Sequence, residues 1–250
     1  MTRARERCQP PVTPSSASDF EIAALDRTEI SFAPWSWPFA KDRHAEITTY
    51  FADLCRQRAG VWNGRVLLLN GYAIEGRVLR GSCFETDYAS FCSWRDWSFP
   101  DTSVYNVFAA AALRSADGAV VVGEMAATTA NAGLVTFPCG TPEPDDLDAS
   151  GRLDLAANLG RELMEETGLP IAELKPEPGW TMVRDRCYLA FLKVVAAAET
   201  AELLRARIMR HLAREPRPEF IDIRIVRSLA DLEPAMPPFV SGFLTGLWSR

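Results

Sequence analysis

Three glutamates stand close together in residues 161–169, which read Arg-Glu-Leu-Met-Glu-Glu-Thr-Gly-Leu. Glu162 lies three residues before Glu165 and four before Glu166. On an α-helix these spacings place side chains on one face, with Cβ atoms about 5–6 Å apart. Like charges at that distance repel each other, and a divalent cation between them reverses this effect, because carboxylate oxygens are the ligands that Mg²⁺ prefers. The segment therefore predicts a helix whose carboxylates bind a metal ion.

Two neighbouring residues support a helical site. Arg161 lies four residues before Glu165, so its guanidinium can hold part of the cluster when no metal is bound. Gly168 follows the last expected turn and suits a helix C-cap. The simpler alternative is a solvated acidic helix face that ends at a glycine, which is the usual meaning of an isolated Glu-x-x-Glu-Glu pattern.

The complete string favours the metal site, because it resembles the second half of the Nudix box at every fixed position. By chance such a match should arise on the order of once in a thousand chains of this length, or less often. Nudix enzymes use Mg²⁺, with Mn²⁺ as an alternative, to hydrolyse a nucleoside diphosphate linked to another moiety. The resemblance implies that Glu162, Glu165 and Glu166 are metal ligands. It also implies that Glu165 and Glu166 take part in catalysis and that Arg161 orients the glutamates.

The first half of the box departs from the family pattern. Gly140 is followed six residues later by Asp146, where the family has a glutamate. Residues 147–160 then separate Asp146 from Arg161, about twice the family's spacing, so we expect an inserted surface loop over 147–153. The resemblance implies that the backbone carbonyl of Gly140 adds a metal ligand. It leaves open whether Asp146 takes the role of the missing glutamate.

The sequence defines the substrate less closely. Residues 140–144 are similar to a Gly-Thr-Pro-Asp/Glu-Pro signature of Nudix proteins with a longer loop, among them sugar-nucleotide hydrolases. This likeness implies a UDP- or ADP-sugar as the first candidate substrate. The candidate general base is a box glutamate, Glu177 or Glu219. The candidate substrate contacts are Trp35, Trp37, Trp94 and Arg184.

Composition excludes several other classes of protein. The 250 residues are 48% hydrophobic and 24% charged, which is ordinary for a globular chain. A net charge of −6 argues against a protein that coats nucleic acid. No apolar run reaches the ~18 residues that a membrane span needs. We therefore expect a small-molecule nucleotide as the partner, with no nucleic acid and no membrane, and the oligomeric state stays open, with a homodimer among the options.

The cysteines indicate the compartment. None of the six forms a Cys-x-x-Cys pair, so neither a zinc site nor a disulfide framework is predicted. Reduced thiols are typical of a cytoplasmic protein, which is the expected location. The cysteines are residues 8, 55, 83, 92, 139 and 187.

The elements that must position the box follow from hydrophobic periodicity. Helices are predicted over 40–58, 87–94, 154–167, 200–212 and 237–248. Strands are predicted over 66–69, 73–79, 104–113, 119–123, 134–137, 187–195 and 219–226, with the first two joined by a hairpin turn at Asn70-Gly71. In the box helix, Leu155, Leu159 and Leu163 should form the buried side, away from the glutamates.

The resemblance implies an α/β fold, a Nudix-type α/β/α sandwich with a mixed sheet, plus an N-terminal α/β extension. We expect residues 1–18 to be a disordered tail, 19–103 to be the extension packed on the core, and 104–250 to be the Nudix domain. Two other functions stay open. One is a non-catalytic protein that binds or senses a nucleotide metabolite on the same fold, and the other is a structural protein with an acidic helix face.

Overall fold

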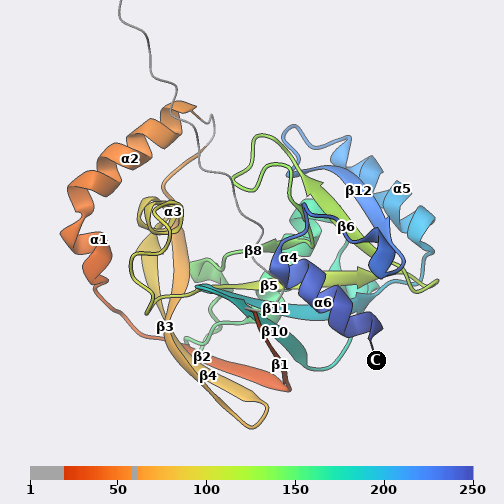
Figure 1. The fold of residues 1–250 in the computed structure, drawn as a ribbon, viewed down its shortest axis with the longest axis horizontal. Helices are drawn as coiled ribbons and strands as arrows, with labels where there is room; N and C mark the ends of the chain where they lie inside the picture. The colour runs from red at the N-terminus through yellow and green to blue at the C-terminus, as the bar shows by residue number, and fades with distance from the viewer. Residues whose placement is uncertain (1–19, 58–60, 250) are drawn as a thin grey trace, which may run out of the picture.

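The computed structural model describes residues 20–57 and 61–249. The tail expected over residues 1–18 lies outside this range. Within it, a nine-stranded mixed sheet and a smaller three-stranded sheet carry helices on their faces (Figure 1). The predicted fold class, α/β with a mixed sheet between layers of helices, is confirmed.

The nine-stranded sheet forms the centre of the molecule. Its main path has the order β1-β10-β11-β5-β6-β12, and β11 pairs with β5 in parallel while the other neighbours are antiparallel. Three short strands attach to it, β7 to β6, β8 to β5 and β9 to β11. The strands are β1 Glu21–Leu25, β5 Asn106–Arg114, β6 Val120–Met125, β7 Val135–Thr136, β8 Cys139–Gly140, β9 Lys175–Pro176, β10 Trp180–Asp185, β11 Tyr188–Ala196 and β12 Phe220–Val226.

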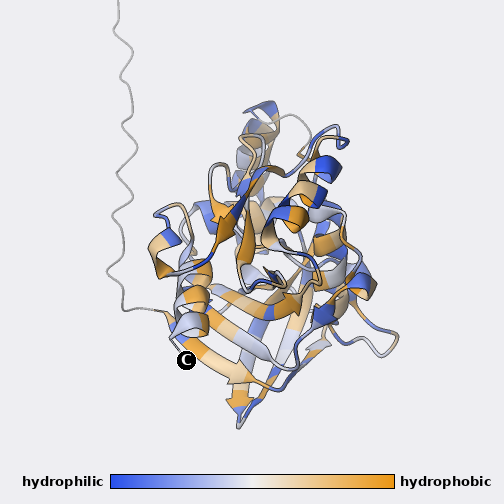
Figure 2. Ribbon diagram, turned by 90° about the vertical axis from the view of Figure 1, so that its right-hand side faces the viewer, coloured by the Kyte–Doolittle hydropathy of each residue, from blue (hydrophilic) through white to orange (hydrophobic). Residues whose placement is uncertain are grey.

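The central strand β5 separates two hydrophobic cores. Val107, Ala109 and Ala111 pack in one core with α4 (Leu155–Thr167) and α5 (Ala201–Leu212). The alternate residues of β5, such as Phe108, pack in the other core with α6 (Pro238–Trp248). Because both faces are covered, β5 is apolar along nearly its whole length, as is typical of a doubly buried strand. Hydrophobic residues are accordingly concentrated on the inner strands (Figure 2).

The N-terminal residues build a second layer system. Strands β2 (Arg27–Phe32), β4 (Val78–Asp87) and β3 (Arg65–Glu75) form the small sheet, in that order. Helices α1 (Pro38–Asp42), α2 (His44–Gln57) and α3 (Tyr88–Asp96) surround an aromatic core with Trp37, Phe84 and Trp94 (Figure 1). The first strand of this region, β1, instead forms one edge of the large sheet.

The predicted hairpin at Asn70-Gly71 is wrong. β3 runs without a turn from Arg65 to Glu75, and the Asn-Gly pair is absorbed by a register shift between Leu69 and Gly71. Such a bulge lets a turn-forming sequence stay within a strand. The turn lies at Gly76, whose φ of 62° is in the left-handed region that favours glycine. The strand predicted over 73–79 is in fact the end of β3 and the start of β4, and the sequence did not predict β1, β2, β8, β9 or β10. β1 is largely exposed, so its apolar pattern is weak.

Most predicted helices are confirmed, together with their ends. The side chain of Asp154 caps α4 by accepting hydrogen bonds from the backbone nitrogens of Ala156 and Ala157, at 2.9 and 3.0 Å. At the other end, Gly168 has a φ of 69°, and its N–H donates to the carbonyl of Met164. These local signals fix the limits of the helix that carries the glutamates.

The five cysteines within the described residues are free thiols, and Cys8 lies outside that range. In the described residues, no helix combines the length and the apolar character that crossing a membrane requires.

Substitution of Phe137 should measure how tightly the core packs against α6. It is fully buried, and its ring meets that of Phe243 at a centroid distance of 5.8 Å. Phe137→Ala should lower the free energy of unfolding by about 3–5 kcal/mol, measured by urea denaturation, because it leaves a cavity. Ile221→Ala, at an exposed position of β12, is the control and should cost less than about 1 kcal/mol. Equal losses in the two variants would contradict this packing.

Candidate active site

The box helix α4 buries two of its three glutamates. Glu162 and Glu166 are 8% and 4% exposed, whereas Glu165 lies at the surface. The predicted burial of Leu155, Leu159 and Leu163 is confirmed, but the expectation that the glutamates lie away from the buried side is wrong for Glu162 and Glu166. The reason is β8, which lies over the helix and covers the face next to the leucines.

β8 approaches the glutamates closely at two points. A Cβ atom on Gly140 would lie 2.3 Å from Cδ of Glu162, so no larger residue fits without displacing that carboxylate. The backbone N–H of Cys139 donates to Oε2 of Glu166 at 2.9 Å. The close approach therefore favours glycine here, as the box pattern predicts, because a larger residue would displace the carboxylate of Glu162.

Arg161 is shared among three carboxylates. Its Nη2 lies 2.9 Å from Oδ2 of Asp146 and 2.8 Å from Oε1 of Glu162, and its Nη1 lies 3.3 Å from Oε2 of Glu165. The guanidinium thus joins the acid that precedes the insertion to two of the helix glutamates. This is the arrangement in which an arginine holds the cluster together in the absence of metal.

Asp146 lies in this network although the loop after it is long. It is 4% exposed, and its Oδ2 accepts from the backbone N–H of Glu143 at 2.9 Å and from Nδ2 of Asn158 at 3.1 Å. The backbone N–H of Asp154, the cap of α4, donates to the carbonyl of Asp146 at 2.9 Å. The two ends of the insertion are therefore adjacent, and Asp146 orients Arg161.

The insertion over residues 147–153 is not only a surface loop. Leu147 and Leu153 form a β-bridge that closes it, and Leu153 is buried. Its backbone also pairs with β2, because the N–H of Leu153 donates to the carbonyl of Ile30 and the N–H of Phe32 donates to the carbonyl of Gly151. The expectation of a mostly polar surface loop is corrected for these two leucines.

The local electrostatics are strongly negative. Burial raises the pKa of Glu162 to about 7, and Glu165 adds to the rise while Arg161 opposes it. Burial, followed by the charges of Glu219 and Glu162, raises the pKa of Glu166 well above its ordinary value. Loss of hydration and the nearby Glu165 also raise the pKa of Glu219. One guanidinium does not neutralise this group of acids.

A cavity of about 710 Å³ opens beside the acids. Glu162, Glu165, Arg161 and Gly140 form one part of its lining, and Glu219 joins them from the segment before β12. The opposite part comes from α3, β5, β10 and β11, with Tyr88, Asn106, Asp185 and Tyr188 among the lining side chains. No sequence signal marked these residues, because strands distant in the chain bring them together.

The predicted substrate contacts lie elsewhere. Trp37 and Trp94 are core residues whose indole nitrogens donate to Asp101, at 2.8 Å in each case. Trp35 packs edge-on against Phe84, and Arg184 pairs with Glu21 at 3.5 Å. None of these four predicted contacts lines the large cavity.

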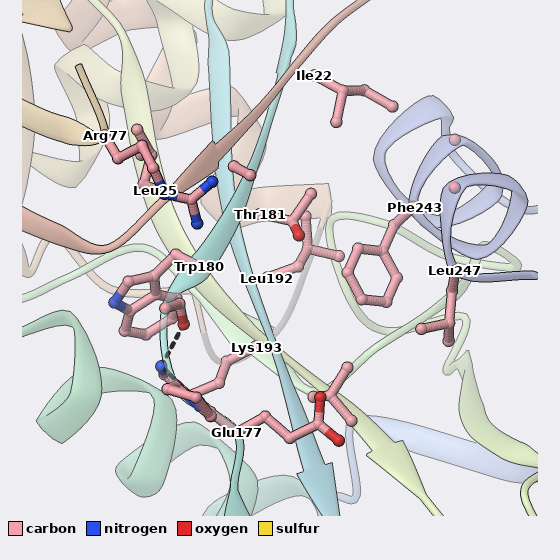
Figure 3. A pocket seen from close by; sticks show the side chains of 16 residues that line it. Ile22, Leu25, Arg77, Glu177, Trp180, Thr181, Leu192, Lys193, Phe243 and Leu247 are labelled. Carbon is pink, nitrogen blue, oxygen red and sulfur yellow. Dashed lines mark hydrogen bonds between the residues drawn. The ribbon is translucent and has the colours of Figure 1, made fainter. Parts of the chain in front are cut away.

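Of the two candidate bases outside the box, only Glu219 reaches the cavity. Glu177 lines a separate pocket of about 170 Å³ together with Trp180 and Lys193 (Figure 3). Its carboxylate pairs with Arg114, and its backbone carbonyl accepts from Nζ of Lys193 at 3.1 Å. The structure therefore keeps Glu219, and not Glu177, among the groups beside the box.

Solved structures of other proteins are similar to part of this chain. No protein-family model and no curated protein matches the chain. A Nudix hydrolase from M. smegmatis, RenU, is 16% identical over 58% of this chain and 89% of its own, with a TM-score of 0.38. A MutT protein from Methanosarcina mazei Go1 is 18% identical over 57% of this chain and 91% of its own, with a TM-score of 0.36. A Nudix hydrolase from Nitrosomonas europaea is 18% identical over 49% of this chain and 72% of its own, with a TM-score of 0.32. Two of these three similar structures are described as Nudix hydrolases. Likenesses of this size do not assign an activity, which must rest on the site itself.

The donor chemistry of the site fits a divalent cation. Four carboxylates, those of Glu162, Glu165, Glu166 and Glu219, influence one another electrostatically, and hard cations prefer such oxygens. As the side chains stand, no set of three or more His, Cys, Asp or Glu in the described residues could hold a metal ion. The reason is visible in the ion pairs, because Arg161 engages Glu162 and Glu165. The ligand set Gly140, Glu162, Glu165 and Glu166 stays a prediction.

Replacing Asp146 should show that it orders Arg161. Asp146→Ala leaves the guanidinium and the amide of Asn158 without their buried acceptor, so the free energy of unfolding should fall by about 3–5 kcal/mol. Glu165→Gln loses only an exposed pair to the same arginine and should cost less than about 1 kcal/mol. Urea denaturation of both variants measures this. A loss below about 1 kcal/mol for Asp146→Ala would rule out the ordering role.

The buried glutamates should make the metal-free protein pH-sensitive. The pKa of Glu162 in the folded state, about 7, lies above its ordinary value of 4.5. Its contribution to stability is therefore complete below about pH 4.5 and is lost as the pH rises to about 7. With a chelator present to remove metal, the free energy of unfolding of the wild-type protein should fall over this pH interval by on the order of 1–3 kcal/mol more than that of Glu162→Gln. Parallel stability curves for the two proteins in urea denaturation would contradict the burial of an ionisable Glu162.

Proposed function

We propose that this chain is a Mg²⁺-dependent pyrophosphohydrolase that cleaves the diphosphate of a nucleoside diphosphate linked to another moiety. The products would be a nucleoside monophosphate and a phosphorylated compound. The observation that carries the proposal is the group of acids beside the large cavity, in which Glu162 and Glu166 are buried and Arg161 is the one ion-pair partner that the described residues give to Glu162. A surplus of buried negative charge is costly unless a cation joins it.

The residues would divide the work as the box resemblance implies. Glu162, Glu165 and Glu166, with the carbonyl of Gly140, would hold the ion, which when bound supplies charge neutralisation and an activated water. Mn²⁺ is the alternative metal. Arg161 would orient the glutamates. Glu219 is the candidate general base from outside the box, because it lines the same cavity and its raised pKa makes its carboxylate a stronger proton acceptor than an ordinary glutamate.

A nucleotide sugar such as a UDP- or ADP-sugar is the first candidate substrate. A cavity of about 710 Å³ is in the usual range for a ligand of that size. We also propose the division into an extension over 19–103 and a Nudix domain over 104–250, and a cytoplasmic location. The extension supplies α3, which lines the cavity with Tyr88 and Phe91.

The alternative is a non-catalytic protein that binds a nucleotide metabolite. One observation favours it, namely that no set of three metal-binding side chains is arranged in advance among the described residues. The deciding assay is the release of monophosphate or phosphate with Mg²⁺ from nucleotide sugars, dinucleotides and nucleoside triphosphates. Turnover identifies the enzyme, whereas binding without turnover on the whole panel identifies the sensor.

Glu166→Gln separates catalysis from stability. It should lower kcat by at least about a hundredfold, because it removes a metal ligand and its charge. Stability of the metal-free protein should change little, since the amide oxygen can still accept from Cys139 and a buried repulsion is relieved. The control, Glu202→Gln on the exposed face of α5, should change neither. A destabilised Glu166→Gln with normal turnover would contradict the assigned role.

A further inference from the structure

A row of three polar side chains, one from each of three neighbouring strands, lines part of the cavity. Asp185 of β10 pairs with Tyr188 of β11, and Tyr188 pairs with Asn106 of β5. All three line the cavity, as expected because directly paired residues on neighbouring strands project from the same face of a sheet. With strands about 4.8 Å apart, the row is about 10 Å long.

The three side chains keep hydrogen-bonding capacity for a ligand. Asn106 is 6% exposed, and its Oδ1 accepts from the hydroxyl of Thr141 at 3.0 Å. Within the described residues, the amide NH₂ group of Asn106 has no hydrogen-bond partner. The carboxylate of Asp185 and the hydroxyl of Tyr188 also have no hydrogen-bond partner among these residues. All three side chains line the cavity, where their free donors and acceptors are available to a bound ligand.

The row begins beside the box and leads away from it. Thr141, which bonds Asn106, follows Gly140, and Gly140 lies against the carboxylate of Glu162. Asp185 stands at the far end, two strands away. A substrate whose diphosphate meets the box carboxylates would therefore lay its next moiety along the row.

The far end of the row is suited to a neutral group. Asp185 accepts hydrogen bonds from O–H or N–H and repels a phosphate. Arg186, the cation that acts on Asp185, donates from Nη2 to the backbone carbonyl of Ser98 at 3.2 Å. Arg95, which acts on Tyr188, is paired with Asp96 at 2.8 Å. Aromatic side chains, Tyr88 and Phe91 of α3 among them, add flat apolar surfaces that suit the face of a ring.

We propose that Asp185, Tyr188 and Asn106 form the subsite for the moiety beyond the diphosphate, a neutral ring that carries hydroxyl or N–H donors. Asp185 accepts from these donors and disfavours a terminal phosphate, and Asn106 donates to an acceptor nearer the diphosphate. A sugar and a nucleobase share this chemistry. The placing of the diphosphate rests on the proposed function, whereas the binding of the ring does not.

The test is ring binding to the full chain without metal. Saturation-transfer NMR titrations with adenosine, uridine and methyl glucoside use probes that lack a diphosphate. We expect at least one of them to bind wild type, and its identity distinguishes a base from a sugar. Asp185→Asn and Asn106→Ala should each raise the dissociation constant of that probe by at least about tenfold, because each substitution removes a hydrogen-bonding partner.

Two further variants make the outcomes distinct. Asp53→Asn, an exposed carboxylate of α2, should bind the probe as wild type does. Glu166→Gln should keep ring binding while losing hydrolysis, so ring binding without turnover in wild type would end the proposed function and leave the subsite standing. The subsite is overturned if no probe binds wild type. It is also overturned if Asp185→Asn and Asn106→Ala, both folded by circular dichroism, bind the probe unchanged.

Discussion

The burial of several carboxylates around a single guanidinium is the constraint on which the site depends. Asp146, Glu162 and Glu166 are nearly inaccessible, and Arg161 directly contacts two of them. Such a group costs stability in proportion to its unpaired charge, because buried charges lose hydration. Clusters of buried acids beside a cavity are typical of functional sites. The proposed binding of a metal ion and a diphosphate at this position would account for the cluster.

The surrounding elements hold the acids in place from outside the box. The backbone N–H of Leu67 in β3 donates to the carbonyl of Pro142 at 2.7 Å, so the small sheet contacts the segment between β8 and Asp146. The insertion is held by β2 through Ile30 and Phe32. The N-terminal strands thus brace both sides of Asp146, which explains how a lengthened loop still presents its acid to Arg161.

The helix that carries the box was predictable because its signals are local. Asp154, Gly168 and the glutamate spacing all lie within one segment, and each has a direct physical meaning. The burial of Glu162 was not predictable, since it depends on the approach of Gly140 from another strand. In β3 the local signal at Asn70-Gly71 failed, because pairing with β4 on both sides of the bulge outweighed the turn preference.

In the cavity, the sequence pattern identified the acidic residues of the box but not the residues of the opposite wall. The residues of the box are close together in the chain, so a sequence pattern can identify them. The opposite wall depends on the parallel pairing of β5 with β11, whose paired residues Asn106 and Tyr188 are far apart in sequence. It also depends on α3, which belongs to a separate aromatic core. That wall is nevertheless joined to the box, because Asn106 accepts a hydrogen bond from Thr141, the residue after Gly140. Its arrangement therefore depends on contacts between segments that are far apart in the chain, which no local sequence pattern records.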